Sequence, residues 1–320
     1  MDEAKMNETE HAKSVTSDSS ARATGRPPFQ EAKTRSKRLK LLLWGDSGVG
    51  KTTQALQFPG PVMIDLEGGA DLYGDAFGFH ILKATTADEV SGAINWLLTH
   101  DHPYKTLIID PITMYWDALM WKWSGVFLRR NKGTRGHKHE LYDFQPKDWM
   151  TMKAELKDVM RKVIALDMNV VVTARQKPQY ADGGFMQVVG ETFDGEKSLP
   201  YMFDTIVRLY RDGQGRFLGE CLKDRSNKLP RGEFECSYSV FEDAFGDALQ
   251  REVKPVELAT EGQKEEIRKH IEHFELTPEQ VKQRLENYGV SKLDELTAED
   301  AETILGKLHA TLAARGEDHH

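Results

Sequence analysis

The sequence has little cysteine, no long apolar run and no excess of positive charge, and each absence excludes a class of protein. Only two of the 320 residues are cysteines, Cys221 and Cys236. Two cysteines are too few for a disulfide framework, so we expect both to be reduced residues of a cytoplasmic protein. No apolar run approaches the length of a membrane span, and no signal peptide begins the chain, so we predict no membrane partner.

The balance of charge argues against a general nucleic-acid-binding protein, because the formal net charge is −8. Most of this negative charge lies between Val256 and His320, where 15 acidic and 8 basic residues give a net charge of −7. The first 255 residues are therefore nearly neutral, and basic segments there can still contact nucleic acid. The length suffices for one large domain and a small one.

One segment, Leu39 to Phe58, carries the strongest motif of the chain. Its apolar run, Leu39 to Trp44, predicts a buried strand; GDSGVGKT follows, and then a short amphipathic helix pattern. This strand, glycine-rich loop and helix form the order of a Walker A nucleotide site, rather than a glycine-rich turn that matches by chance. Lys51 would reach the outer phosphates of ATP, and the Thr52 hydroxyl would bind Mg²⁺. The predicted phosphate-binding residues are Gly45, Asp46, Ser47, Gly48, Val49, Gly50, Lys51, Thr52 and Thr53.

Two carboxylates follow later strands. A short apolar run, Val62 to Ile64, ends before Glu67, at the edge where parallel sheets bind ligands. Glu67 is placed either to orient the water that attacks the γ-phosphate or to cap a loop. A second apolar strand ends in Asp110, about 60 residues after the Walker A loop, which is a Walker B pattern whose carboxylate would hold Mg²⁺ through water.

Two segments are candidates for contact with single-stranded DNA. The first, Val126 to Phe144, combines basic residues, glycines and aromatic rings, which suit the backbone and bases of a single strand; a solvated surface loop is the alternative. Its basic residues are Arg129, Arg130, Lys132, Arg135 and Lys138. The second, Gln176 to Tyr201, is predicted to be a long loop in which Lys177 contacts DNA, unless it is a lid or a disordered flap.

The rest of the chain predicts further elements. Helices are expected from Thr86 to Leu97, Trp116 to Phe127 and Pro146 to Leu166, and strands from Gly78 to Lys83, Asn169 to Thr173, Asp204 to Tyr210, Arg216 to Lys223 and Phe234 to Phe241. Asp243 to Pro255 is predicted to be a linker. Three helices follow; their acidity favours a protein partner over DNA. The predicted organisation is a disordered tail (1–37), an ATPase core (38–243), a linker (244–258), a helical module (259–315) and a short tail (316–320).

Two kinds of side chain have competing interpretations. Lys223 and Arg225 lie two residues apart and share one face of an extended strand. They could reach the nucleotide of a neighbouring subunit, as an arginine finger does, or form surface ion pairs. The pairs His100/His102 and His137/His139 have no further ligands nearby in the sequence, so we predict no zinc site there.

The order GDSGVGKT, IDLEGG, LIID, VVVTA and LKDR resembles the RecA-like recombinase core. The phrases FPGPVMIDLEGG, TLIIDPIT and YDFQPKDWMTMK are similar to phage RecA-like ATPases that act as single-strand annealing proteins, over about Leu39 to Phe241. The start of the C-terminal module, ATEGQ, is more weakly similar to tails of phage recombination proteins.

This resemblance implies an α/β fold with a mostly parallel sheet, flanking helices and an antiparallel hairpin at one edge. It implies that Lys51 and Thr52 bind phosphate and Mg²⁺, that Glu67 activates water, and that Asp110 is the Walker B acid. Arg175 falls at the γ-phosphate sensor, where the family often has Gln or His, and Pro111 replaces a usual Ser. Lys223 and Arg225 match cations that reach the next subunit's ATP, and both loops fall where filaments grip DNA.

We therefore expect an ATP- and Mg²⁺-dependent ATPase that binds single-stranded DNA as a homo-oligomer, filament or ring, and promotes annealing or strand exchange in phage recombination. The expected location is the cytoplasm of a bacterial host, and the C-terminal module would bind a single-strand binding protein or another recombination protein. One alternative is a helicase-type motor or loader accessory. The other is a P-loop kinase or switch that does not act on DNA.

Overall fold

The computed structural model describes residues 38–130, 146–181, 187–253, 257–286, 288, 290 and 292–315. The predicted tails, 1–37 and 316–320, lie outside these residues. The strands are β1 Lys40–Gly45, β2 Pro61–Asp65, β3 His80–Lys83, β4 Thr106–Asp110, β5 Asn169–Tyr180, β6 Val188–Phe193, β7 Thr205–Arg211, β8 Phe217–Asp224 and β9 Gly232–Glu235. The helices are α1 Lys51–Leu56, α2 Ala87–Thr99, α3 Ile112–Arg130, α4 Pro146–Ala165, α5 Leu199–Met202, α6 Tyr238–Gln250, α7 Glu261–His273, α8 Pro278–Glu286 and α9 Ala298–Arg315, with 3₁₀ turns η1 Ala70–Tyr73 and η3 Leu293–Glu295.

The sheet is mostly parallel, as the sequence predicts. Its order is β3-β2-β4-β5-β1-β7-β8-β9, and the neighbours from β3 to β7 run parallel to one another. At one edge β8 pairs antiparallel with β7 and β9. The predicted strand Phe234 to Phe241 is only partly right, because β9 ends at Glu235 and helix α6 begins at Tyr238.

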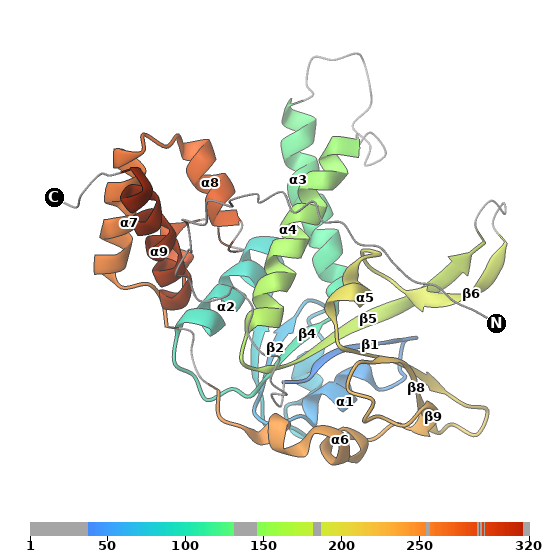
Figure 1. Cartoon of the computed structure of the whole chain (residues 1–320). Helices are drawn as coiled ribbons and strands as arrows, with labels where there is room; N and C mark the ends of the chain where they lie inside the picture. Colours follow the sequence, from blue (N-terminus) through green and yellow to red (C-terminus); the bar gives the residue numbers. More distant parts are fainter. Residues whose placement is uncertain are drawn as a thin grey trace, which may run out of the picture. The chain divides into compact units, whose positions relative to one another are not determined.

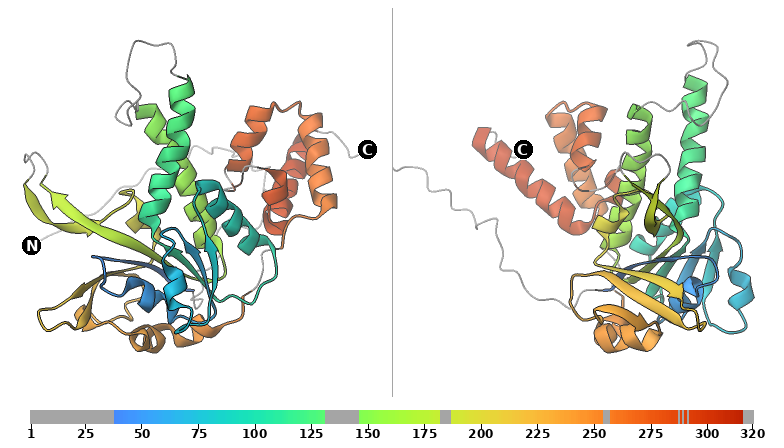
Figure 2. Two further views of the ribbon diagram at one scale, coloured as in Figure 1. Left: turned by 180° about the vertical axis from the view of Figure 1, so that it is seen from behind. Right: turned by 90° about the vertical axis from the view of Figure 1, so that its right-hand side faces the viewer.

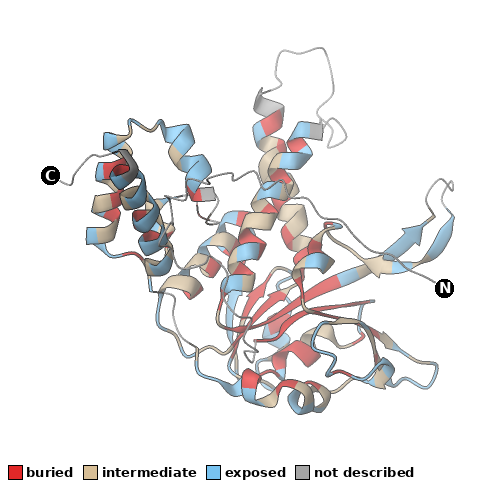
Figure 3. Cartoon of the chain, viewed as in Figure 1, coloured by how far each residue is buried: buried red, intermediate tan, exposed pale blue. Residues whose placement is uncertain are grey.

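Helices cover both faces of the sheet (Figures 1 and 2). Alternate side chains of β1 point to opposite faces: Leu42 packs in the cluster with residues of α2, α3 and α4, whereas Leu41 and Leu43 pack in the cluster with residues of α1 and α6. Burial on both faces explains why β1 is a continuous apolar run. Figure 3 shows this burial at the centre of the sheet. No helix among the described ranges is long and apolar enough to span a bilayer.

The predicted linker Asp243 to Pro255 is wrong for its first half, because α6 continues to Gln250. Phe241, Phe245 and Leu249 recur at helical spacing and are buried against the sheet. Burial of three large side chains stabilises a helix in a stretch whose acidic residues and glycine suggest a linker.

The predicted long loop Gln176 to Tyr201 is also wrong, because it contains two paired strands and a helical turn. Strand β5 continues to Tyr180 and pairs antiparallel with β6, from Gln176 opposite Phe193 to Tyr180 opposite Val188. Main-chain hydrogen bonds therefore form this hairpin arm (176–181 and 187–193), and its outer residues are exposed (Figure 3). Residues 182–186 lie outside the described ranges.

The three C-terminal helices have their own hydrophobic cluster. Ile267 of α7, Leu285 of α8 and Leu305 of α9 are buried in it, with Leu296 between η3 and α9. Helix α7 begins with a capping box, in which the Thr260 hydroxyl accepts from the Gln263 N–H. These elements match the three predicted helices of the C-terminal module.

Candidate nucleotide site

The Walker A segment forms a tight loop between β1 and α1. Gly48 and Gly50 have φ angles of 73° and 88°, in the left-handed region that favours glycine. At Gly45 a Cβ atom would lie 2.2 Å from the carbonyl oxygen of Leu209, so the close approach of β7 requires glycine there. The loop thus has the strand, turn and helix geometry of a phosphate-binding loop.

The ammonium group of Lys51 lies inside this loop. Its Nζ donates to the carbonyl oxygens of Gly45 at 3.0 Å and Asp46 at 2.6 Å. Burial lowers the pKa of Lys51, and the nearby carboxylates of Asp110 and Glu67 act in the opposite direction. Carbonyl oxygens carry only a partial negative charge. A bound phosphate would therefore be a stronger partner for the ammonium group than these two carbonyl groups are.

Asp110, at the end of β4, accepts two hydroxyl hydrogen bonds. Thr52 donates to Oδ2 at 2.6 Å, and the hydroxyl of Thr173 on β5 donates to Oδ1. Burial raises the pKa of Asp110, while these two hydrogen bonds favour its ionised form. The adjacent hydroxyl and carboxylate oxygens of Thr52 and Asp110 are the hard ligands that Mg²⁺ prefers, so the donor set fits this ion. Bound there, Mg²⁺ would neutralise charge on the phosphates.

The turn after β2 shows which of its carboxylates caps the loop. Asp65 is buried, and its carboxylate accepts from the N–H groups of Glu67, Gly68 and Ala70. Asp65, rather than Glu67, therefore holds the turn together. The side chain of Glu67 is left at the cavity, with 47% of its surface exposed. This geometry favours the water-orienting interpretation of Glu67 over the capping one.

Arg175 pairs directly with Glu67. Its Nε and NH2 groups donate to Glu67 Oε1 at 2.9 and 2.6 Å. The N–H of Arg175 also donates to the hydroxyl of Thr113, at the start of α3. The predicted γ-phosphate sensor and the predicted water-activating carboxylate are thus joined in one ion pair, which sequence patterns do not reveal because 108 residues separate them.

These groups surround one cavity of about 320 Å³. The residues that line it are Asp46, Ser47, Gly48, Gly50, Lys51, Thr52, Glu67, Tyr73, Asp110, Pro111, Arg175 and Gln176. Of the predicted phosphate-binding residues, three do not line the cavity. Gly45 lies against β7, Val49 is buried in the core, and the carbonyl group of Thr53 accepts from Gln57. Tyr73, Thr173 and Gln176 were not predicted as site residues. For Thr173, a polar residue ending an apolar strand was the available signal.

The predicted inter-subunit cations lie away from this cavity. Lys223 Nζ donates to the carbonyl oxygens of Pro200 at 2.7 Å and Phe203 at 2.6 Å. Arg225 pairs with Asp204 at 2.9 Å. Within one chain both cations hold the segment that precedes β7, and their reach to a second subunit stays a prediction.

The predicted DNA-binding residues divide into two groups. Lys177 is on the hairpin arm, where its Nζ donates to Asp194 Oδ1 at 2.8 Å and stays 45% exposed. Arg129 and Arg130 end helix α3, but their side chains, like Lys132, Arg135 and Lys138, lie outside the described residues.

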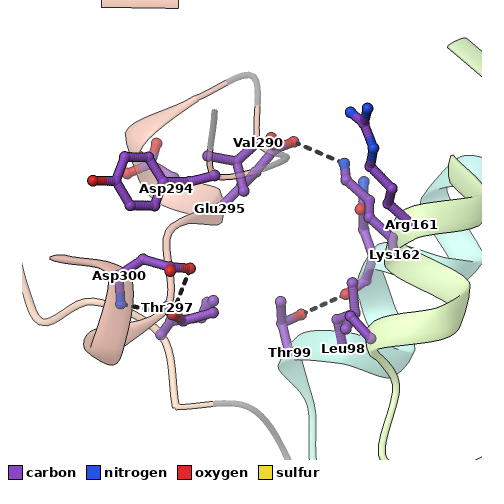
Figure 4. Close-up of a pocket in the computed structure, with 13 residues that line it drawn as sticks. Leu98, Thr99, Arg161, Lys162, Val290, Asp294, Glu295, Thr297 and Asp300 are labelled. Atoms are coloured by element: carbon purple, nitrogen blue, oxygen red, sulfur yellow. Dashed lines mark hydrogen bonds and ion pairs between the residues drawn. The ribbon is translucent and has the colours of Figure 1, made fainter. Parts of the chain in front are cut away.

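A second, larger cavity of about 820 Å³ is built differently (Figure 4). Arg161 and Lys162 of α4 line it, together with Asp294, Glu295 and Asp300. Lys162 pairs with Glu295 at 3.8 Å, and Thr297 donates to Asp300 at 2.7 Å. The described residues that line this cavity include no glycine-rich loop, so it lacks the phosphate-binding backbone of the Walker A cavity.

Comparison with known protein families agrees with this geometry. A family model described as AAA domain matches residues 37–226, which is more than half of the chain. No curated protein matches the sequence. The matched range contains the Walker A loop, Glu67, Asp110 and Arg175, and ends after Arg225.

Proposed function

We propose a function for this chain, which belongs to the AAA domain family of P-loop ATPases. In this proposal it is an ATP-dependent recombinase that binds single-stranded DNA. It would promote annealing or strand exchange in phage DNA recombination. ATP would lie between subunits of a homo-oligomer, where Lys223 and Arg225 of one subunit reach the nucleotide of the next. Nucleotide binding and ATPase chemistry follow from the family; the DNA substrate and the assembly are the proposal.

One observation carries the proposal: a single strand joins the nucleotide site to the hairpin arm. Strand β5 contains Thr173, which bonds Asp110, then Arg175, which bonds Glu67, then Gln176, which lines the cavity. The next residue, Lys177, and the exposed Tyr180 are already on the arm. A shift of Arg175 would therefore reach a basic and an aromatic side chain within five residues.

Helix α3 makes a parallel connection. It begins at Ile112, two residues after Asp110, and leads at its other end into the basic segment 131–145. The Thr113 hydroxyl accepts from the N–H of Arg175 and donates to the carbonyl oxygen of Asp194, at the base of the arm. Thr113 thus joins α3, β5 and the segment after β6. Both predicted DNA segments are continuous with residues of the nucleotide site.

The Glu67–Arg175 pair supplies the coupling that we propose. A γ-phosphate carries more negative charge than a carboxylate and would compete with Glu67 for the Arg175 guanidinium. Glu67 would then be free to accept a proton from the attacking water. Arg175 would move with the phosphate and pull on the arm. After hydrolysis and phosphate release, the ion pair would form again and DNA affinity would fall.

DNA binding by variants of the arm tests this proposal. We would measure the fluorescence anisotropy of a labelled single strand with Mg²⁺ and a non-hydrolysable ATP analogue. The variant Lys177→Ala with Tyr180→Ala should weaken binding by about 10-fold or more, because it removes a phosphate contact and a stacking ring. The matched control is Lys83→Ala, an exposed lysine on the edge strand β3 that pairs with Asp71.

Equal affinity of the arm variant and the wild type would refute a role of the arm in DNA binding. Absence of DNA binding at low salt, with ATP still hydrolysed, would favour a P-loop kinase or switch. Unwinding of duplex DNA without annealing would favour a helicase-type motor or loader.

A further inference from the structure

The C-terminal helices bring together three side chains of the types that ligate metals, far from the Walker motifs in the sequence. Glu266 and His270 lie one turn apart on the same face of α7, and His309 is on α9. One ligand atom from each of the three lies within 4.8 Å of the others. The imidazole rings of His270 and His309 have centroids 5.5 Å apart, and Nε2 of His309 lies 2.8 Å from Oε1 of Glu266.

We propose that Glu266, His270 and His309 form a binding site for a divalent transition-metal ion, with Zn²⁺ the best match. Two imidazole nitrogens and one carboxylate oxygen are a ligand set that zinc commonly takes in proteins, with a fourth position left for water. Imidazole ligands favour zinc, nickel, cobalt or copper, whereas Mg²⁺ and Ca²⁺ prefer sites built from oxygen.

Packing positions the three side chains before any ion binds. Ile267, next to Glu266, and Leu305, one turn before His309, are both buried in the C-terminal cluster. His270 is itself buried, with only 8% of its surface exposed. Because the backbones of α7 and α9 are fixed by these contacts, the donors need little ordering when they bind an ion.

The three ligand atoms lie slightly farther apart than in a zinc site, so they would have to move closer together to bind the ion. In a tetrahedral zinc site with bonds of about 2.0–2.2 Å, neighbouring ligand atoms lie roughly 3.4 Å apart. The spread of up to 4.8 Å therefore requires movements of the order of 1 Å. Glu266 and His309 are 46% and 39% exposed, so rotation of their side chains can supply this movement and an ion can enter from solvent.

Two cations near Glu266 on α7 pair with other carboxylates. Lys264 pairs with Glu261, and Arg268 pairs with Glu265 at 3.2 Å. Glu266 instead faces His309, which is the contact that a bound cation would replace. The ion would join α7 to α9 and so brace the helical module, independently of the proposed function.

Metal titration of the full chain tests this site. The protein would be treated with a chelator, freed of nucleotide and titrated with Zn²⁺ by calorimetry, and with Co²⁺ by visible absorption, which reports tetrahedral coordination. We expect one ion per chain with a dissociation constant of about 1 µM or tighter. Zn²⁺ should also raise the melting temperature of the wild type.

Two exposed ligands allow variants that keep the fold. His309→Gln and Glu266→Gln should each weaken Zn²⁺ binding by about 10- to 100-fold or more and abolish the thermal shift. The matched control is His273→Gln, on the same helix but outside the cluster. A chain that ends at residue 315 controls for His319 and His320. Both controls should bind as the wild type does, and circular dichroism would confirm that every variant is folded.

Binding that His309→Gln and Glu266→Gln leave unchanged would overturn the proposal. So would a Zn²⁺ titration of the wild type that does not saturate at one ion, or a signal that disappears when residues 316–320 are removed.

Discussion

Two hydrogen-bonded pairs of side chains set the chemistry of the nucleotide site. Thr52 and Asp110 place a hydroxyl beside a carboxylate, and Arg175 holds Glu67 through two bonds to one oxygen. The first pair offers oxygen ligands to Mg²⁺. In the second, the Glu67 carboxylate is occupied by Arg175 until another anion attracts the arginine. The predicted Mg²⁺ ligands and the predicted water-activating carboxylate therefore belong to separate pairs.

Glu67→Gln should separate hydrolysis from binding. Because a glutamine cannot accept the proton of the attacking water, we expect kcat to fall by about 100- to 10,000-fold. The affinity for ATP should be unchanged or higher, because a neutral glutamine competes less than glutamate with the γ-phosphate for the Arg175 guanidinium. Steady-state hydrolysis and equilibrium binding of a fluorescent ATP analogue measure the two effects. Hydrolysis by Glu67→Gln at nearly the wild-type rate would exclude Glu67 as the base.

A matched variant, Arg175→Ala, distinguishes the coupling from simple catalysis. It should lower kcat as well, but combining it with Glu67→Gln should cost little more than the larger single effect, because the two residues act as a unit. Fully additive losses of activation free energy would contradict a shared role for the pair.

The placement of Lys51, Thr52 and Asp110 could be predicted because each belongs to a short motif at the end of an apolar strand. The Glu67–Arg175 and Thr173–Asp110 pairs could not. They depend on β2, β4 and β5 lying side by side in register, and local sequence does not fix the order of strands in a sheet. The contact of His270 with His309 could not be predicted either, because it depends on the packing of α7 against α9, which α8 separates in the chain.

Among the secondary-structure elements, the C-terminal end of helix α4 is bound by a buried lysine side chain. Lys40 on β1 is buried, and its Nζ donates to the carbonyl oxygens of Val163 at 3.4 Å, Leu166 at 2.8 Å and Met168 at 2.9 Å. These acceptors lie at the negative end of α4 and just beyond it, where a cation is favourable. Burial nevertheless lowers the pKa of Lys40 to about 7.

The lowered pKa predicts how stability depends on pH. An unfolded lysine keeps its proton up to a pKa of about 10.4, so between pH 7 and 10 the unfolded chain binds more protons than the folded one. Stability due to Lys40 should thus be lowest below pH 7 and rise with pH through this window. The free energy of unfolding of the wild type, relative to Lys40→Met, should increase by roughly 1–4 kcal/mol. Urea titrations at pH 7 and 10 measure it, and a difference independent of pH would contradict the lowered pKa.

Elements were predicted well where apolar residues repeat along the sequence, and poorly where main-chain pairing alone forms the strands. The helix Pro146 to Leu166 and the strands around the Walker motifs agree with the structure within a few residues. The arm of β5 and β6 was missed because Lys177, Pro178 and Gln179 carry no strand signal, and their order comes from main-chain bonds to β6. The helix α6 was missed although Phe241, Phe245 and Leu249 recur at helical spacing, because the prediction divided this stretch into a strand and a linker.

For the whole molecule, the central question is how a chain with a net charge of −8 could act on DNA. Because the negative charge is concentrated after Val256, the ATPase core is nearly neutral, and its basic residues need act only through local segments. In the proposed function, the continuity of β5 and α3 with the nucleotide site would connect bound ATP to these segments. DNA binding should weaken steeply as salt is added, because phosphate contacts release counterions.

The measurement that tests this account most directly is the rate of ATP hydrolysis with and without single-stranded DNA. We would compare the wild type, Lys51→Ala, and the double variant of Lys177 and Tyr180. The account predicts strong stimulation of the wild type by single strands, no hydrolysis by Lys51→Ala, and basal hydrolysis with reduced stimulation for the arm variant. Hydrolysis by the wild type that is indifferent to DNA, together with no DNA binding at low salt, would contradict it.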